Sequence, residues 1–454
     1  MALGTFAIGT DGFVIAGVLP SIAHDVHVTT EAAGLLVTMF AVVYGLAAPV
    51  LTAASARTDR RNVLVVGMAV LSAANAVGAI APSYAWLVTA RVAAALGAAM
   101  YSPIALAAAV QVSPTAERGR AVSRVLAGMT MSLVLGVPLG VLLGSLGGWR
   151  WTFGFVAVVS AVAGLAVVVL LPRIPTVPTS SLKARLALLR RPAIVANLGG
   201  TFLWITGAFT AYTFIAPILA GATGWHGSAI SALLLVYGAA AVAGNKMGGI
   251  AADRFGARRA IVFALLSLVA SLSAVSYATR LGPPWGVPII IAALVAWAGA
   301  GWSLTPAQSH RLVGMAPSAG PEVLSLNTSA VYLGIATGAA LGGQVVTHFG
   351  PARLGFAAAV LQLLALGVVG AKIPRIRPHL PTAAIAVANP TPPLNLRTEA
   401  PCTPTSPTDW PKDAATICAA LPSNSGATKP PEADPYGDGH GWRPRVHRPP
   451  AAPW

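Results

Sequence analysis

Two charged residues that interrupt long apolar runs are the candidates for chemistry in this sequence. Asp11 lies in the run GTDGF at residues 9–13, and Arg91 lies in the run LVTAR at residues 87–91. Loss of water favours the neutral form of a carboxylate, whereas a neighbouring guanidinium favours its charged form. A carboxylate held between these two influences can bind and release a proton, so Asp11 and Arg91 are the predicted proton-coupling site. The alternative for Asp11 is a position near the water interface, as an ordinary exposed carboxylate.

Other reactive residue types lack the spacing that an enzyme or a metal site requires. Lys246 lies near the end of an apolar run, where we expect its side chain to reach the membrane surface. The eight histidines are scattered, and none shows HExxH spacing. The two cysteines, Cys402 and Cys418, form neither a disulfide framework nor a CxxC pair. With no GxxxxGK[ST] phosphate loop either, we expect no enzyme activity, no cofactor and no metal, and an ion gradient as the energy source.

The composition identifies the class of protein. The chain has 454 residues, of which 56% are hydrophobic and 9% charged, with a net charge of +16. A soluble domain has roughly 25% charged residues, so this chain cannot cover a water-facing surface. Its apolar runs have about the 20 residues of a membrane-spanning helix. We therefore predict an all-α membrane protein in a lipid bilayer. We expect no nucleic-acid partner, because the basic residues lie in short loops between apolar runs.

The apolar runs predict twelve transmembrane helices. Lys and Arg are concentrated in the loops on the side of the two termini, whereas the opposite loops hold only Arg150, Arg280 and Arg353. By the positive-inside rule, both termini are expected in the cytoplasm. The predicted spans are residues 3–22, 32–54, 62–81, 84–111, 121–147, 150–172, 194–219, 227–251, 259–278, 286–306, 323–347 and 354–373.

A helix–loop–helix pattern occurs twice, which predicts two similar halves. The first copy holds Val43-Tyr44-Gly45 and then Asp59-Arg60-Arg61. The second copy starts at Tyr237 and holds Gly249, Asp253, Arg254, Gly256, Arg258 and Arg259. The predicted domains are a first bundle at 1–172, a cytoplasmic linker at 173–193, a second bundle at 194–374 and a disordered Pro-rich tail at 375–454. Because the first span begins almost at Met1 without a basic leader, we expect the natural start to lie upstream.

Glycines four residues apart line one face of two predicted spans. Span five has Gly128, Gly136, Gly140 and Gly144, and span eleven has Gly334, Gly338 and Gly342. Such a stripe lets two helices approach closely in lipid. Pro138 lies inside the first stripe, where it removes a backbone hydrogen bond and is expected to kink the helix. We expect the two halves to pivot or seal at this kink, and we expect helix packing alone for span eleven.

The loop pattern and the fourth span resemble the major facilitator superfamily, and the resemblance extends over residues 1–374. Residues 249–259 are similar to the loop signature that this superfamily has between spans two and three. The first copy of the loop departs from the signature, since Ser55 and Asn62 stand where glycines are usual. Residues 87–99, which include Arg91, are similar to the span-four motif whose arginine is linked to proton coupling in antiporters.

Two further motifs resemble one branch of that superfamily. Residues 128–144 are similar to the span-five motif of antiporters, which favours the twelve-helix drug:proton antiporter branch. Residues 9–25 resemble the first-span signature of chloramphenicol and arabinose efflux permeases. Many of those relatives carry an acidic residue where Gly12 stands, and Asp11 is the residue that would substitute for it.

The resemblance implies two pseudo-symmetric six-helix bundles that rock about a site near the membrane midplane. It implies a monomer that exports a small amphipathic drug such as chloramphenicol, with a proton entering at Asp11 near Arg91. The loop motifs become a cytoplasmic gate, in which Asp253 faces the start of span five and Asp59 faces the start of span eleven. The residues expected from their positions to line the cavity are Phe13, Tyr44, Trp204, Phe209, Tyr212 and Tyr332.

Other functions share part of this evidence. An exporter of sugars, nucleosides or other small metabolites would have the same fold and a more polar cavity. A uniporter or importer would not need the span-five motif at residues 136–144. A membrane-embedded sensor that transports nothing has no distinguishing feature in the sequence.

Overall fold

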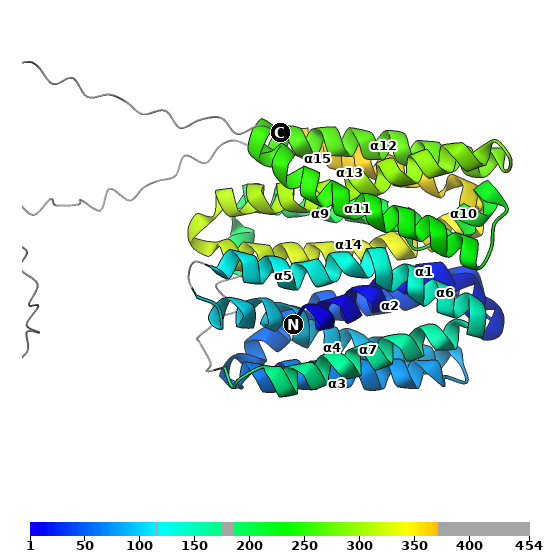
Figure 1. The fold of residues 1–454 in the computed structure, drawn as a ribbon. Coiled ribbons are helices and arrows are strands. Elements are labelled where there is room, and N and C mark those ends of the chain that lie inside the picture. The colour runs from blue at the N-terminus through cyan, green and yellow to red at the C-terminus, as the bar shows by residue number, and fades with distance from the viewer. Residues whose placement is uncertain (115–116, 175–185, 371–454) are drawn as a thin grey trace, which may run out of the picture. The chain divides into compact units, whose positions relative to one another are not determined.

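The described residues of the computed structural model contain twelve helices that are long and apolar enough to cross a membrane. The structure describes residues 1–114, 117–174 and 186–370. The tail predicted at 375–454 and most of the predicted linker therefore lie outside the described residues. The helices lie side by side, and the chain passes back and forth between the two ends of the molecule (Figure 1).

The first six spans form one bundle, coloured blue to green in Figure 1. Helices α5 and α6 are one span, joined by a π-helical turn, η3, directly before Pro138. Proline has no N–H to continue the α-helical pattern, and the span takes π-helical geometry in the turn before it, while the predicted kink stays a prediction. The elements are α1 (Ala2–Asp25), α2 (Thr30–Ala54), η1 (Ser55–Arg57), α3 (Arg60–Ala79), α4 (Tyr84–Gln111), α5 (Arg118–Met131), η3 (Ser132–Gly136), α6 (Val137–Gly147) and α7 (Trp149–Leu170).

The last six spans form the second bundle. Its elements are η4 (Leu188–Arg190), α9 (Pro192–Tyr212), α10 (Ile215–Thr223), α11 (Ser228–Phe255), α12 (Ala257–Leu281), α13 (Gly286–Met315), η5 (Pro317–Ala319), α14 (Gly320–Phe349), η6 (Pro351–Arg353) and α15 (Leu354–Gly370). Two predicted boundaries were wrong. Helix α13 continues through Pro306 to Met315, because packed neighbours in a membrane bundle tolerate a proline. The span predicted at 194–219 is broken between α9 and α10.

The two ends of the bundles differ in charge, and we call them the arginine-rich and the arginine-poor end. The arginine-rich end includes the loop after α2 and the turn between α11 and α12, with Arg57, Arg60, Arg61, Arg258 and Arg259. The arginine-poor end includes Arg150, Arg280 and Arg353. Gly256 makes the abrupt turn at the arginine-rich end, with a φ of 86° that residues with a Cβ avoid.

The two glycine stripes pack in corresponding places of the two bundles. A Cβ added to Gly136 would overlap Thr10 of α1, and one added to Gly338 would overlap the carbonyl oxygen of Thr206 on α9. The fifth span therefore packs on the first, and the eleventh span packs on the seventh, as a duplicated fold requires. The glycines of span five therefore pack within their own bundle, against α1 and the start of α7.

The bundles meet along two pairs of helices: α2 packs on α14, and α11 packs on η3 and α6. Near the arginine-poor end, Gly17 of α1 approaches Leu234 of α11. In the middle of the molecule, the Tyr44 ring of α2 stacks on the Tyr332 ring of α14, with centroids 3.7 Å apart. These contacts close the space between the bundles from the arginine-poor end to the middle.

Candidate functional site

Asp11 and Arg91 form a buried ion pair between α1 and α4. Arg91 Nη1 donates to Asp11 Oδ1 at 2.7 Å, and Arg91 Nη2 donates to the backbone carbonyl of Asp11 at 3.4 Å. Their side chains are only 1% and 2% exposed. Asp11 is therefore not an exposed carboxylate near the water interface, and its charge depends on Arg91 for compensation.

The ion pair leaves two buried polar atoms unused. Within the described residues, Asp11 Oδ2 and Arg91 Nε have no hydrogen-bond partner. A carboxylate oxygen without a donor is a place where a proton can bind, because the protonated group carries no charge to compensate. The arrangement can therefore hold Asp11 as an anion paired with Arg91 or as a neutral acid.

Two neighbours of the ion pair were missed by the sequence analysis. The Arg91 guanidinium carbon lies 4.3 Å from the centroid of the Phe40 ring on α2, a favourable cation–π distance. Asn75 of α3 is buried beside the Asp11 carboxylate, and its Nδ2 donates to the carbonyl of Leu71 at 2.9 Å. Asn75 carried a usable signal, since it is an amide inside an apolar span.

Phe13, two residues after Asp11, reaches a cluster of rings in the second bundle. We call Phe13, Phe209, Tyr212, Tyr237, Trp297 and Trp302 the ring cluster. The Phe13 centroid lies 6.0 Å from Phe209 and 5.9 Å from both Tyr212 and Trp302. The structure thus brings the predicted cavity residues Phe13, Phe209 and Tyr212 together. Tyr237, Trp297 and Trp302 were not predicted, because only packing shows which aromatic residues face the same space.

Tyr44 and Tyr332 form a second group of rings, stacked on each other, and Trp204 is a buried residue of α9. The Phe40 ring is stacked 6.2 Å from Tyr44, which links this ring pair to Arg91. A cavity of about 20 Å³, enough for roughly one water molecule, is lined by Ile8, Gly9, Gly12, Phe13, Val37, Phe40, Met129, Tyr332 and Ile335. The carbonyl of Trp204 accepts from Gln362 within the second bundle, and the described ring contacts do not include Trp204.

Among the described contacts, those of the two loop-motif carboxylates do not cross between the bundles. Asp59 caps α3 by accepting from the N–H of Arg61 at 2.8 Å, and Ile174 N also donates to it at 3.4 Å. Asp59 thus contacts its own bundle and not the start of α14. Asp253 is exposed near the end of α11, and the described part of the chain shows no ion pair for it. Contacts across the arginine-rich end remain a prediction for a conformation that is closed there.

Two other sequence predictions concern residues on α11 and in span five. Lys246 is exposed on α11, as expected for a lysine that reaches the surface. Of the span-five motif, Pro138 lies at the contact between the bundles, where its carbonyl accepts from the hydroxyl of Ser231 at 2.6 Å. The kink region therefore touches the second bundle through Pro138 and through Leu133, which Gly238 of α11 approaches.

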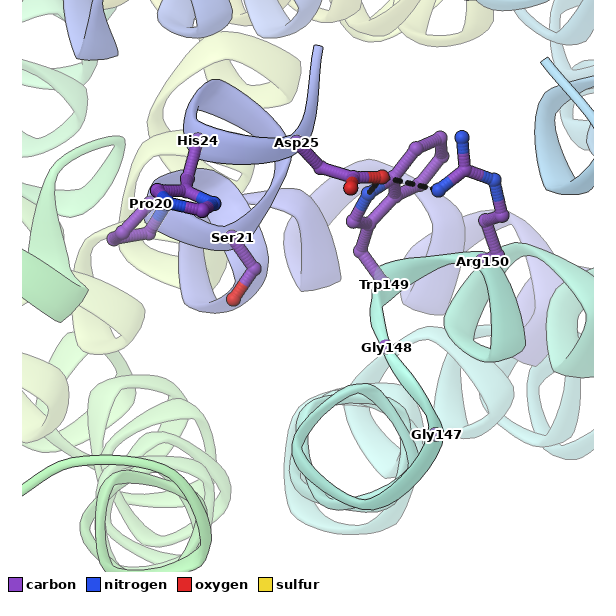
Figure 2. Close-up of a pocket in the computed structure, with 8 residues that line it drawn as sticks. All are labelled: Pro20, Ser21, His24, Asp25, Gly147, Gly148, Trp149 and Arg150. Carbon is purple, nitrogen blue, oxygen red and sulfur yellow. Dashed lines mark hydrogen bonds and ion pairs between the residues drawn. The ribbon is translucent and has the colours of Figure 1, made fainter. Parts of the chain in front are cut away.

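A second cavity, of about 470 Å³, opens at the arginine-poor end (Figure 2). It lies between the end of α1, with Ser21, His24 and Asp25, and the turn into α7. Asp25 Oδ2 accepts from Trp149 Nε1 at 2.9 Å and pairs with Arg150. The side chains of Asp25 and Arg150 are 46% and 42% exposed. Solvent screens such a pair, so this cavity lacks the buried charge of the Asp11 site.

The second bundle holds a cluster of neutral polar side chains. Most of them lie on α9 and α13, the helices that correspond to α1 and α4, and one lies on α14. We call Asn197 and Thr201 of α9, Gln308 of α13 and Asn327 of α14 the amide cluster. Gln308 Nε2 donates to the Asn197 carbonyl at 2.9 Å and to Thr201 Oγ1 at 3.0 Å. Thr201 Oγ1 in turn donates to Asn327 Oδ1 at 2.8 Å. The sequence did not predict this cluster, although its amides also lie within apolar spans.

Comparisons with known proteins agree with this architecture. The family model of the Major Facilitator Superfamily matches residues 1–215 and 198–404. The uncharacterized MFS-type transporter YbcL of Bacillus subtilis (strain 168) is 32% identical over 366 residues, which cover 81% of this chain and 93% of that protein.

Two solved structures share the fold. A D-xylose-proton symporter aligns with a TM-score of 0.68 at 16% identity, over 82% of this chain and 96% of its own. The human organic anion transporter MFSD10 (TETRAN) aligns with a TM-score of 0.60 at 18% identity, over 81% and 97%. Together with the twelve spans in two bundles, these matches place the protein among multi-pass membrane transporters rather than enzymes. The chain belongs to the Major Facilitator Superfamily.

Proposed function

We propose that this transporter is a proton-coupled antiporter that exports a small amphipathic compound, such as chloramphenicol, across the cytoplasmic membrane. The observation that carries the proposal is the Asp11–Arg91 pair, with its 2.7 Å contact and its unpartnered Oδ2. A proton at Asp11 removes one charge of the pair and so weakens the attraction between α1 and α4. Ionisation of Asp11 restores that attraction, which gives the first bundle two arrangements.

The ring contacts of Phe13 support a mechanism in which binding of a proton at Asp11 disfavours binding of the cargo. It follows Asp11 on α1 by half a helical turn and contacts Phe209, Tyr212 and Trp302 of the second bundle. An aromatic cargo would replace these ring contacts between the bundles. A shift of α1 when Asp11 is protonated would therefore alter the cargo site. Exchange of the cargo for a proton requires such a link between the two sites.

The charge distribution supports the orientation. The arginine-rich end belongs in the cytoplasm by the positive-inside rule, which places both termini there. With that orientation, the contacts between the bundles near the arginine-poor end support an inward-facing conformation, and we expect the transporter to act as a monomer. A proton that moves down 100 mV supplies about 2.3 kcal/mol, enough for roughly fiftyfold accumulation of an uncharged cargo.

A second candidate is a proton-coupled exporter of sugars, nucleosides or other small metabolites. The amide cluster favours it, because Asn197, Gln308 and Asn327 are neutral groups of the kind that hydrogen-bond hydroxyls. The D-xylose-proton symporter shares the fold at 16% identity, which says nothing about the cargo of this chain.

The test is transport of labelled chloramphenicol into proteoliposomes, with D-xylose as the second probe. Wild-type protein should accumulate chloramphenicol when a proton gradient is imposed. The Asp11→Asn/Arg91→Gln double variant keeps the site neutral and polar, and should lose gradient-driven accumulation while it still exchanges internal for external chloramphenicol. Gradient-driven accumulation by this double variant would contradict the coupling role of Asp11.

The matched control is Asp25→Asn, which breaks the exposed pair at the arginine-poor end and should leave accumulation unchanged. If the wild type moves D-xylose and not chloramphenicol, the second candidate replaces the first, and the coupling test is repeated with that sugar.

A further inference from the structure

Two hydroxyl groups, one from each bundle, donate across the contact between the bundles. Thr38 Oγ1 of α2 donates to the carbonyl of Ala336 on α14 at 3.3 Å. Ser231 Oγ of α11 donates to the carbonyl of Pro138 in α6 at 2.6 Å. Both hydroxyl-bearing residues are buried, at 9% and 7% exposure.

The sequence repeat relates these two hydrogen bonds. Thr38 and Ser231 are as many residues apart in the chain as the repeated pairs Tyr44-Gly45 and Tyr237-Gly238. The acceptors correspond in the same way, since Gly136 and Gly140 flank Pro138 as Gly334 and Gly338 flank Ala336. The same bond is therefore made twice, at positions related by the pseudo-symmetry of the fold.

A glycine lies two helical turns after each hydroxyl, on the same helix face. A Cβ on Gly45 would lie 3.2 Å from Tyr332 Cβ, and one on Gly238 would lie 2.6 Å from the carbonyl carbon of Leu133. Each contact between the bundles thus combines one hydroxyl-to-carbonyl bond with one close approach of the helices. The close approach brings the acceptor carbonyl within reach of the hydroxyl.

These hydroxyls differ from others in the spans. Thr52 donates to the Ala48 carbonyl and Ser309 to the Thr305 carbonyl, each four residues back in its own helix. A Ser or Thr can exchange an acceptor on a neighbouring helix for this local one. The acceptor carbonyls also retain their own helical geometry. The bonds of Thr38 and Ser231 can therefore break without leaving a buried donor unsatisfied, as a reversible contact requires.

We propose that Thr38 and Ser231 are twofold-related latches that hold the arginine-poor end closed, and that together they set the fraction of protein in the closed conformation. The proposal rests on alternating access, and it holds for any cargo and any coupling ion. Its failure is therefore distinguishable from failure of the proposed antiport function.

The test measures the distance between nitroxide labels across the arginine-poor end by pulsed electron paramagnetic resonance. The full-length chain carries Cys402→Ser and Cys418→Ser, which removes both natural cysteines. Labels are placed at Ser83→Cys and His226→Cys, two exposed positions at that end, one in each bundle.

In this background the short distance of the closed form should dominate. Thr38→Val and Ser231→Ala should each shift the ratio of closed to open protein roughly fivefold toward the open form, and together about twenty-five-fold. Thr52→Val and Ser309→Ala are the matched controls, because they remove hydroxyls that bond within their own helix.

An unchanged distance distribution in the folded double variant would overturn the proposal. A shift from only one of the two single variants would overturn its twofold character. If the double variant does not fold, the two single variants and Ser231→Thr, which retains a donor, still decide, and Ser231→Thr should behave as wild type.

Discussion

The two bundles share one fold but keep different buried polar groups on corresponding helices. Spans one and four carry the oppositely charged Asp11 and Arg91, whereas spans seven and ten carry the neutral Thr201 and Gln308. An ion pair changes when a proton binds, while amide–hydroxyl hydrogen bonds stay the same over the physiological pH range. The duplicated fold thus holds an ion pair in one half and a neutral hydrogen-bonded group in the other, and under the proposed antiport only the first half would respond to protons.

The largest effect should come from leaving Asp11 without its partner. Arg91→Met leaves a buried carboxylate uncompensated, and we expect a loss of about 3–5 kcal/mol in the free energy of unfolding in detergent micelles. Asp11→Asn/Arg91→Gln should recover most of this stability, because no charge stays buried. Equal destabilisation by the single and the double variant would show that lost packing, and not an unpaired charge, is the cause.

A smaller effect should separate the two glycine stripes. A Cβ at position 338 would overlap the backbone of α9, since it would lie 2.4 Å from Thr206 O and 3.0 Å from Thr210 N. A Cβ at position 140 would instead lie 2.6 Å from Val14 Cγ2, a side-chain atom that can shift. We expect Gly338→Ala to cost about 3 kcal/mol of unfolding free energy and Gly140→Ala about 1 kcal/mol. The reverse order in thermal unfolding would contradict this view of the packing.

Mutation of the amide cluster should lower the free energy of unfolding less than mutation of the ion pair, since the amide cluster holds no charge. Gln308→Met removes two hydrogen bonds, to the Asn197 carbonyl and to Thr201 Oγ1, with an expected cost of about 2 kcal/mol in unfolding free energy. The proton dependence of transport should be unchanged, which a comparison of initial rates at several external pH values would measure. An altered pH profile would place proton coupling in both bundles.

The smallest change in unfolding free energy should come from mutating the loop-motif carboxylates, and it should differ between the two copies of the motif. Asp59→Ala removes the cap of α3 and should cost about 1 kcal/mol. Asp253→Ala removes an exposed side chain and should leave the unfolding free energy within about 0.5 kcal/mol of wild type. Its transport rate should nevertheless fall if Asp253 closes the arginine-rich end in the other conformation. Wild-type transport by Asp253→Ala would exclude that gate.

The sequence predicted the membrane spans better than it predicted which side chains and helices contact one another. The predicted number of twelve spans is confirmed among the described residues. Asp11 and Arg91 drew attention because charges are rare in apolar runs, and they form a buried ion pair, whereas their role in proton coupling stays a prediction. The contact of the Trp204 carbonyl with Gln362 was not predictable from its place in the chain. The neighbour of the span-five glycines was not predictable, since a stripe of small residues shows that a helix approaches but not which one.

By itself, the sequence determined a twelve-span membrane protein with a duplicated half, because bilayer thickness sets the length of the apolar runs and repetition is visible in the chain. Only the tertiary structure decided that Asp11 pairs with Arg91, that Asn75 and Phe40 border this pair, and that the bundles meet through α2 with α14 and α11 with α6. Those facts depend on the rotation of each helix about its axis and on contacts between distant spans. Both are determined by packing over the whole molecule, which local patterns do not specify.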